Sequence, residues 1–219
     1  MKGYEDSAYE RLMHSAAKLF AQKGFDGTTT RQIVADAGSS LSSLQAHFQS
    51  KECLYHAVIE RTLNTFCERN APIINEIRST ETSGSLDADT AWDLIVELTT
   101  QILDWAFNAA YRNEISIINR EILMSEENGQ ELPRAAFLLY ELFEKLFEFC
   151  AGVKNQDWIK TMSFSLVTSA FDYANYPRVI NRVLGRSADQ PENLTILKTA
   201  AKDYLLTCAR ANIDAHTSC

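Results

Sequence analysis

Apolar residues recur along this chain with the spacing of amphipathic helices, and no segment of useful length alternates with the two-residue period of a strand. The first such segment spans about residues 7–23, and its apolar face consists of Leu12, Ala16, Leu19 and Phe20. Gly24 follows, a residue type that commonly ends a helix. The pattern therefore predicts an all-α fold.

Two short helices are predicted next, over about residues 30–37 and 41–48. Hydroxyl side chains precede each of them as candidate N-caps, at Thr28 and Thr29 for the first helix and at Ser40 for the second. Two helices joined by so short a turn have the dimensions of a helix-turn-helix.

A longer helix is predicted from Lys51 to about Asn70, with Ser50 as its N-cap. Further helices are expected over about residues 90–111, 113–125, 133–151, 155–184 and 191–212. The segment 79–90 is rich in Ser, Thr and Asp and is predicted to be a loop, and other breaks are expected at residues 126–132, 152–155 and 185–190. We expect two domains, residues 6–66 and 67–219.

The composition favours a helical protein with a buried core, because 46% of the 219 residues are hydrophobic and only 8 are Gly and 4 Pro. No stretch approaches about 18 consecutive apolar residues, so no transmembrane helix is expected. The N-terminus lacks the apolar region of a signal peptide, which favours a cytoplasmic location. The five cysteines form no C-x-x-C motif and are expected to be free thiols, and no metal or cofactor is predicted.

The charges are distributed unevenly. Residues 1–54 carry six basic and six acidic side chains, whereas the remainder carries 15 basic and 23 acidic ones and accounts for the whole net charge of −8. An acidic protein is ordinarily a poor binder of phosphate. The N-terminal quarter, which contains the predicted helix-turn-helix, lacks that net negative charge.

A set of residues in this quarter keeps the order and spacing of a known motif: Leu19-Phe20, Gly24-Phe25, Thr28, Ile33, Ala37-Gly38, Ser40, Leu44, His47-Phe48, Ser50-Lys51-Glu52 and Leu54. About the first 60 residues thereby resemble the DNA-binding domain of the TetR (tetracycline-repressor) family. The resemblance implies an N-terminal three-helix DNA-binding domain of the helix-turn-helix type. It also implies a larger C-terminal helical domain that binds an effector and dimerises.

A recognition helix needs buried residues on one face and small or polar residues on the other. Leu44 and Phe48, four residues apart, fit the inner face. The outer face then offers Ser42, Ser43, Gln45 and Ala46 to the major groove, where an amide can pair with adenine. The resemblance implies phosphate contacts from Thr28, Arg31, His47 and Lys51, in a DNA-binding surface that also includes Thr29, Ser40 and Leu41.

Simpler interpretations of these residues remain open. Arg31 and Lys51 could be solvated charges, His47 a packed surface residue and Gln45 a spacer facing solvent. Three positions also depart from the family pattern. Tyr is usual at one or both of positions 45 and 46, a Val-like residue is usual at Ser39, and a basic or small residue often stands at Leu41. These departures bear on which DNA sequence is preferred.

One copy of so small a reading unit covers one half-site, so two copies on palindromic operator DNA are expected. In the resembled family the last two long helices of one chain pack against the same two helices of a second chain and form a four-helix interface. The candidate dimer interface consists of Leu166, Ser169, Ala170, Tyr173, Leu197, Ala201 and Tyr204. The alternative is that these side chains face their own core.

The central helices are rich in aromatic residues, and in the family such a region holds an effector pocket. The candidate pocket residues are Trp92, Trp105, Asn108, Tyr111, Asn119, Phe137, Tyr140 and Trp158. For any one aromatic residue the alternative is core packing. The run Asn119-Arg120-Glu121 could instead be a buried hydrogen-bonded tie between helices.

The leading hypothesis is a homodimeric transcriptional regulator, most often a repressor in this family, that a small hydrophobic effector releases from its operator. A second hypothesis is a helix-turn-helix regulator without an effector. A third is an all-helical enzyme, which we do not favour because the four histidines form no Glu-x-x-His or His-Glu-x-x-His pair and no Gly-rich phosphate loop occurs.

Overall fold

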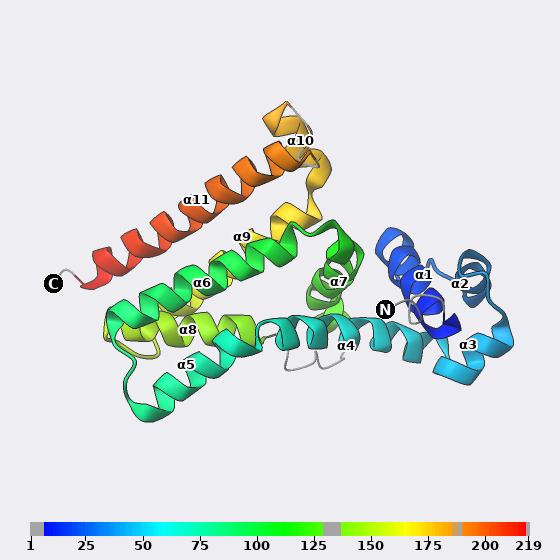
Figure 1. Cartoon of the computed structure of the whole chain (residues 1–219), viewed down its shortest axis with the longest axis horizontal. Coiled ribbons are helices and arrows are strands. Elements are labelled where there is room, and N and C mark those ends of the chain that lie inside the picture. Colours follow the sequence, from blue (N-terminus) through cyan, green and yellow to red (C-terminus); the bar gives the residue numbers. More distant parts are fainter. Residues whose placement is uncertain (1–6, 129–136, 186, 188–189, 218–219) are drawn as a thin grey trace. The chain divides into compact units, whose positions relative to one another are not determined.

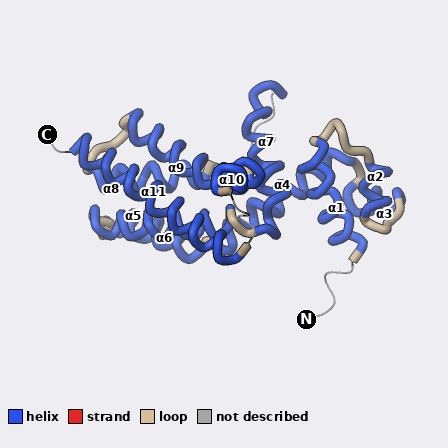
Figure 2. The backbone as a smooth tube through the Cα atoms, turned by 90° about the horizontal axis from the view of Figure 1, so that it is seen from above, coloured by secondary structure: helices blue, strands red, loops and turns tan. Residues whose placement is uncertain are grey.

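The computed structural model describes residues 7–128, 137–185, 187 and 190–217, and the regular structure in these ranges is entirely helical (Figure 2). The helices in chain order are α1 (Ala8–Lys23), α2 (Thr30–Asp36), α3 (Leu41–Phe48), α4 (Lys51–Arg69), α5 (Ala71–Ser83), α6 (Ala88–Ala106), the 3₁₀ turn η1 (Ala109–Tyr111), α7 (Arg112–Asn128), α8 (Leu138–Ala151), α9 (Asp157–Asn175), α10 (Pro177–Leu184) and α11 (Pro191–Thr217). The predicted all-α fold is confirmed. No helix of the described chain is long and apolar enough to cross a membrane.

The chain divides into two compact units, each with its own packing. The first unit is Met1–Thr65 together with Ala110–Pro133, and the second is Phe66–Ala109 together with Arg134–Cys219. The expected domains, residues 6–66 and 67–219, stay a prediction. The structure differs in placing α7 with the N-terminal helices, because α7 packs against α1.

In the first unit, α1, α2 and α3 pack against one another (Figure 1). The predicted apolar face of α1 is buried, with Leu12 and Ala16 fully inaccessible. Ile33 of α2 and Leu54 of α4 are also fully buried. These contacts form the small core that carries α3.

In the second unit, α6 packs against α8 and α9, and α11 packs against α6, α8 and α9 (Figure 1). The core between these helices includes Leu98 and Ile102 of α6 and Phe143, Leu146 and Phe147 of α8, which are inaccessible to solvent. Large apolar side chains at helical spacing thus account for the packing of this unit.

Both ends of the loop predicted over residues 79–90 differ in the structure. The segment 79–90 is helical up to Ser83, because hydroxyl groups there donate to the carbonyls of the preceding turn, such as Thr80 to Glu76 at 2.8 Å. The α6 helix then begins at Ala88, where the side chain of Asp87 accepts a hydrogen bond from the N–H of Thr90 at 2.8 Å.

The single helix predicted over residues 155–184 is instead two helices, α9 and α10. The chain breaks at Tyr176 because the next residue, Pro177, has no N–H to continue the helix and restricts the residue before it. The last helix extends to Thr217, beyond its predicted end. The expected break at residues 126–132 and the expected start of a helix at residue 133 lie mostly outside the described residues.

Candidate DNA-binding site

Three hydroxyl side chains fix the starts of α2, α3 and α4. Thr29 forms a capping box, in which its Oγ1 accepts from the N–H of Gln32 at 3.3 Å and its own N–H donates to Gln32 Oε1 at 3.0 Å. Ser40 Oγ accepts from the N–H of Ser43, and Ser50 Oγ accepts from the N–H of Cys53, both at 3.1 Å. The predicted caps at Thr29, Ser40 and Ser50 are confirmed, and each helix therefore begins at a defined residue.

The short α3 helix has one buried and one exposed face. Leu44 and Phe48 are 3% and 5% exposed, which confirms the predicted inner face. The side chains on the outer face of α3 reach solvent. Those of Leu41, Ser42, Gln45, Ala46 and His47 are exposed, and that of Ser43 is half-buried. The structure therefore brings together the residues expected to face the major groove.

One aromatic neighbour of α3 was not anticipated. The ring of Tyr9 on α1 stacks on Phe48 at a centroid distance of 4.9 Å and meets the His47 ring edge-on at 5.9 Å. Tyr9 thus supports the end of the recognition helix from α1. Because this contact joins residues 38 or more positions apart, nothing in the local pattern predicts it.

Thr28 is placed differently from the expectation. Its side chain is only 1% exposed, and its hydroxyl lies within hydrogen-bond distance of the carbonyls of Leu19 (3.1 Å) and Gly24 (2.8 Å). A phosphate contact by this hydroxyl does not fit its position. Thr28 instead fastens the turn between α1 and α2 to the end of α1.

Of the basic residues expected at phosphate, Arg31 is exposed in the first turn of α2, and His47 is exposed in the last turn of α3. Lys51 points back into its own unit, where Nζ donates to the carbonyls of Phe25 at 3.0 Å and Thr28 at 3.1 Å. The structure thus separates Lys51 from the two basic side chains that face outward.

Hydrogen bonds lower the pKa of two acidic side chains in this unit, Asp36 and Glu52. The ammonium of Lys18 lies 2.7 Å from Asp36 Oδ1, and this hydrogen bond, with one from Ser15, lowers the pKa of Asp36. The backbone N–H of Glu52 itself and the hydroxyl of Ser50 lower the pKa of the Glu52 carboxyl. Asp36 therefore forms an ion pair with Lys18, one of the few basic side chains of the unit.

The run Asn119-Arg120-Glu121 does contain a tie between helices. Arg120 of α7 donates through Nη1 to the carbonyl of Phe20 at the end of α1, at 3.4 Å. The neighbouring Gly24 has φ +75°, and a Cβ there would lie 2.7 Å from the same nitrogen. The side chain of Glu121 lies outside the described residues. Arg120 therefore acts at the C-terminus of α1, where a cation is favoured.

The candidate pocket residues are divided between the two units. Tyr111 and Asn119 belong to the first unit and the other six to the second. Within the second unit the tryptophans have separate neighbours: Trp92 lies under Arg210, Trp105 packs on Phe66 and Phe171, and Trp158 stacks on His216. Asn108 is half-buried, and Phe137 is exposed beside Tyr140.

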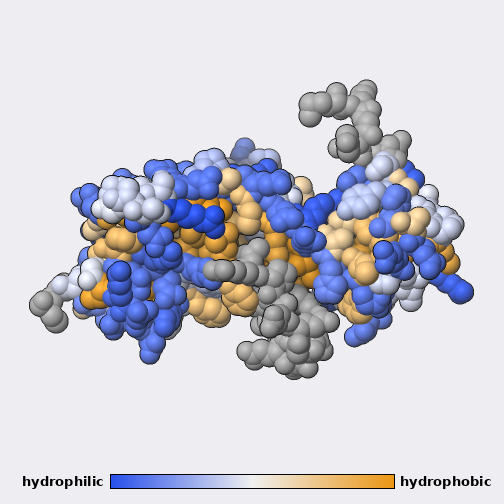
Figure 3. All heavy atoms as spheres, turned by 90° about the horizontal axis from the view of Figure 1, so that it is seen from below, coloured by the Kyte–Doolittle hydropathy of each residue, from blue (hydrophilic) through white to orange (hydrophobic). Residues whose placement is uncertain are grey.

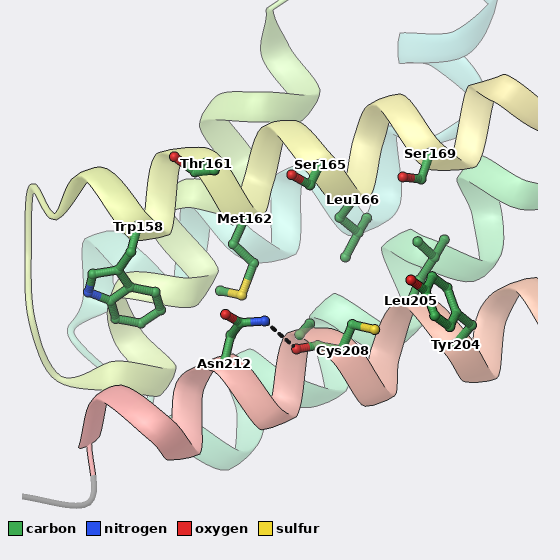
Figure 4. A pocket seen from close by; sticks show the side chains of 11 residues that line it. Trp158, Thr161, Met162, Ser165, Leu166, Ser169, Tyr204, Leu205, Cys208 and Asn212 are labelled. Carbon is green, nitrogen blue, oxygen red and sulfur yellow. Dashed lines mark hydrogen bonds between the residues drawn. The ribbon is translucent and has the colours of Figure 1, made fainter.

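A groove of about 390 Å³ runs between α9 and α11 (Figure 4). Of the candidate dimer residues, Leu166, Ser169 and Tyr204 line it. Ala170, Leu197 and Ala201 are buried inside the unit, so for these three the alternative of core packing holds. Tyr173 is half-buried and stacks on Phe107 at 5.4 Å.

Several large apolar side chains of the second unit are exposed, and one of them, Tyr204, lines this groove. On the face shown in Figure 3, hydrophobic and hydrophilic residues both reach the surface of each unit. Large exposed apolar residues concentrate between positions 164 and 204: Phe164, Tyr176, Val179, Val183, Leu184, Ile196 and Tyr204.

The N-terminal unit matches known proteins. Residues 12–58 fit the sequence model of the bacterial regulatory proteins of the tetR family. An uncharacterized HTH-type transcriptional regulator of Bacillus subtilis, YerO, is 39% identical over 51 residues, which are 23% of this chain and 18% of that protein. The HTH-type transcriptional repressor KstR2 of Rhodococcus jostii is 27% identical over 146 residues, 66% of this chain and 64% of that protein. Each alignment therefore spans less than two thirds of the relative.

The fold of the whole chain also matches. A TetR-like transcriptional regulator from Rhodococcus sp. RHA1 has a TM-score of 0.66 and 20% identity, covering 94% of this chain and 95% of that one. A capped α3 whose outer face is exposed, on a three-helix core, has the geometry of a helix-turn-helix. Residues 12–58 therefore match the tetR family of bacterial regulatory proteins, and the fold of the chain is like that of a TetR-like transcriptional regulator.

Proposed function

We propose that this chain is a repressor that binds palindromic operator DNA as a homodimer and leaves it when a small hydrophobic effector binds. The observation that carries the proposal is α3, whose outer side chains are exposed while Leu44 and Phe48 anchor it to the core. A helix held on one face and polar on the other fits the major groove.

In the proposed complex, Gln45 and the hydroxyls of Ser42 and Ser43 read base edges. Arg31, His47 and the backbone N–H groups at the start of α2 contact phosphates, which sets the register of α3 on the duplex. Thr29, Ser40 and Leu41 complete the surface at the ends of these helices. We leave the side chain of Thr28 out because its hydroxyl is buried.

The second copy is proposed to bind over the groove between α9 and α11. Ile196, Ala200, Tyr204 and Cys208 are exposed at four-residue intervals along α11, and Thr161 and Ser165 are exposed on the facing side of α9. A mostly apolar stripe beside small residues allows close approach of two further helices. A symmetric dimer would bury the same stripe on both chains.

Release by an effector is proposed from the family resemblance and from the aromatic content of the second unit. The α7 helix, which packs on α1, follows α6 of that unit after the short 3₁₀ turn η1. A ligand that displaced α6 would therefore act on α1 through continuous chain, and a coupling of about 1–3 kcal/mol changes DNA affinity roughly 5- to 150-fold.

A regulator without an effector is the second candidate. It is favoured by the division of the candidate pocket residues between two units. The two candidates differ in a thermal-shift screen of small hydrophobic molecules, repeated with bound DNA. An effector raises the melting temperature of the free protein and raises it less when DNA is bound, whereas no compound shows this dependence on DNA if the second candidate is right.

The DNA-binding proposal is tested by selection from a random-sequence pool with the full-length protein. We expect enrichment of an inverted repeat, and a loss of that enrichment when the exposed face of α3 is altered at Ser42 and Gln45. Failure to enrich any sequence above the starting pool would contradict the proposal.

A further inference from the structure

The ring of Tyr9, in the first turn of α1, lies against the last two residues of α3. It stacks on Phe48 at a centroid distance of 4.9 Å and an interplanar angle of 26°, and it meets the His47 ring at 5.9 Å and 79°. The His47 ring also lies 6.1 Å from the ring of Phe48, at 56°. Stacked and edge-to-face pairs are favoured arrangements of aromatic rings. Two rings therefore confine the imidazole of His47, and Tyr9 supplies one of them from another helix.

The two residues after Tyr9 fix the first turn of α1. The carboxylate of Glu10 accepts from Arg61 of α4 at 2.7 Å, and Arg11 donates through Nε to the carbonyl of Ala37, the C-cap of α2, at 3.1 Å. The ring of Tyr9 is therefore carried by a turn that is bonded to two other helices of the unit.

The imidazole of His47 is exposed in the last turn of α3, and the proposed function gives it a contact with DNA. A side chain that rotates freely in the unbound protein loses that freedom on binding, and the affinity falls accordingly. An imidazole that is already confined by neighbouring rings loses less freedom. The Tyr9 ring is thus placed to prepare His47 for its contact.

We propose that Tyr9 is a positioning residue for DNA binding, whose ring holds the imidazole of His47 in the orientation that contacts DNA. This inference rests on the proposed DNA contact of α3 and His47. Tyr9 precedes residues 12–58, the part of the chain that matches the tetR family, so that match assigns it no role.

The first test compares Tyr9→Leu with Tyr9→Phe in the full-length protein. The probe is a duplex selected by the wild-type protein from random-sequence DNA. Tyr9→Leu removes the ring but keeps an apolar side chain against Phe48, and it is expected to raise Kd about fivefold for each bound copy, the cost of ordering one side chain. Tyr9→Phe keeps the ring and is the matched control, with the Kd of the wild type. An equal loss in both variants would make the Tyr9 hydroxyl itself a DNA contact and overturn the proposal.

A double-mutant cycle tests whether Tyr9 acts through His47. In the His47→Ala background no imidazole remains to be held, so adding Tyr9→Leu is expected to leave Kd almost unchanged. A purely structural role of Tyr9 would instead cost the same affinity in both backgrounds.

The NMR signals of the His47 ring protons provide a readout in the absence of DNA. Neighbouring aromatic rings shift these signals through their ring currents. Tyr9→Leu is expected to move the signals toward those of a free histidine, whereas Tyr9→Phe leaves them close to those of the wild type. Tyr9→Met, which fills the space of the ring with a flexible side chain, carries each comparison if Tyr9→Leu does not fold.

Additive losses in the double-mutant cycle, or His47 signals that are the same in Tyr9→Leu and the wild type, overturn the proposal. Failure of the wild-type protein to select any duplex contradicts the proposed function instead. In that case the NMR signals alone decide whether Tyr9 holds the imidazole.

Discussion

Gln45 is the side chain of α3 best suited to recognise a base. It is exposed, whereas its neighbour Leu44 is buried and holds the helix in place. An amide can donate to and accept from adenine at the same time, while a serine hydroxyl fits several bases. Sequence preference is therefore expected to depend on Gln45 more than on Ser42 or Ser43.

Replacing Gln45 by Ala is expected to relax the preference at one base pair of each half-site, with a loss of discrimination of about 1–3 kcal/mol. Binding to an unrelated duplex should change little, because no phosphate contact is removed. The measurement is Kd for the selected duplex, for single-base variants of it and for the unrelated duplex. Uniform weakening on all of them would identify Gln45 as a backbone contact.

The residue roles that depend on local geometry could be predicted from the sequence. Thr29 and Ser40 cap helices because each bonds an N–H three residues away. The roles of Thr28 and Lys51 could not be predicted in this way. Thr28 donates to the carbonyl of Leu19 and Lys51 to that of Phe25, and only the folded turn brings these groups together. Motif spacing identified both residues, but the direction of each side chain comes from tertiary packing.

Among the elements, α7 connects the DNA-binding helices to residues more than ninety positions later in the chain. Arg120 donates to the Phe20 carbonyl, and Gly24 leaves space for its guanidinium. The sequence pattern predicts α7 as a helix but contains no signal for its partner. Its assignment to the first unit therefore required the structure.

Gly24→Ala is expected to lower the free energy of unfolding by about 1–2 kcal/mol, because φ is +75° at this position and a side chain is disfavoured there. The new Cβ also displaces the Arg120 guanidinium. Arg120→Ala should therefore cost less stability in the Gly24→Ala background than in the wild type, as measured by denaturant unfolding of the four proteins. Strictly additive losses would contradict a contact between these two residues.

Some helix boundaries could be predicted from the sequence and others could not. The N-terminal helix starts are set by caps within three residues and were predicted correctly. The composition of residues 79–83 suggested a loop, yet hydroxyl-to-carbonyl bonds such as Thr82 to Arg78 at 2.7 Å satisfy those polar groups within a helix. The Ser and Thr content of a segment alone therefore does not decide whether the segment is a loop or a helix.

At the scale of the whole molecule, few basic side chains are available to DNA. Residues 1–54 have no net charge, and the remainder of the chain is strongly acidic. Lys18 pairs with Asp36, and Lys51 bonds to its own backbone turn. Because phosphate neutralisation supplies most of non-specific binding, one such unit would bind weakly. Two copies acting together are therefore central to the proposal.

Tyr204→Glu is expected to convert the dimer to a monomer in sedimentation velocity, because the side chain is 64% exposed on the apolar stripe of α11. Thr199→Glu, exposed elsewhere on the same helix, is the control and should leave the dimer intact. A charge at Ala170 would not test the interface, since that residue is fully buried and its substitution would unfold the unit. A dimer that persists in Tyr204→Glu would place the interface elsewhere.

The most direct test is a hydroxyl-radical footprint of the full-length protein on its selected duplex. Two α3 helices in successive major grooves predict two equivalent protected segments, about one helical turn apart and on the same side of the DNA. Both segments should disappear together in Tyr204→Glu at concentrations where the wild type protects them. A single protected segment, or protection that survives replacement of Ser42 and Gln45, would contradict the assignment of α3 as the reading element of a dimer.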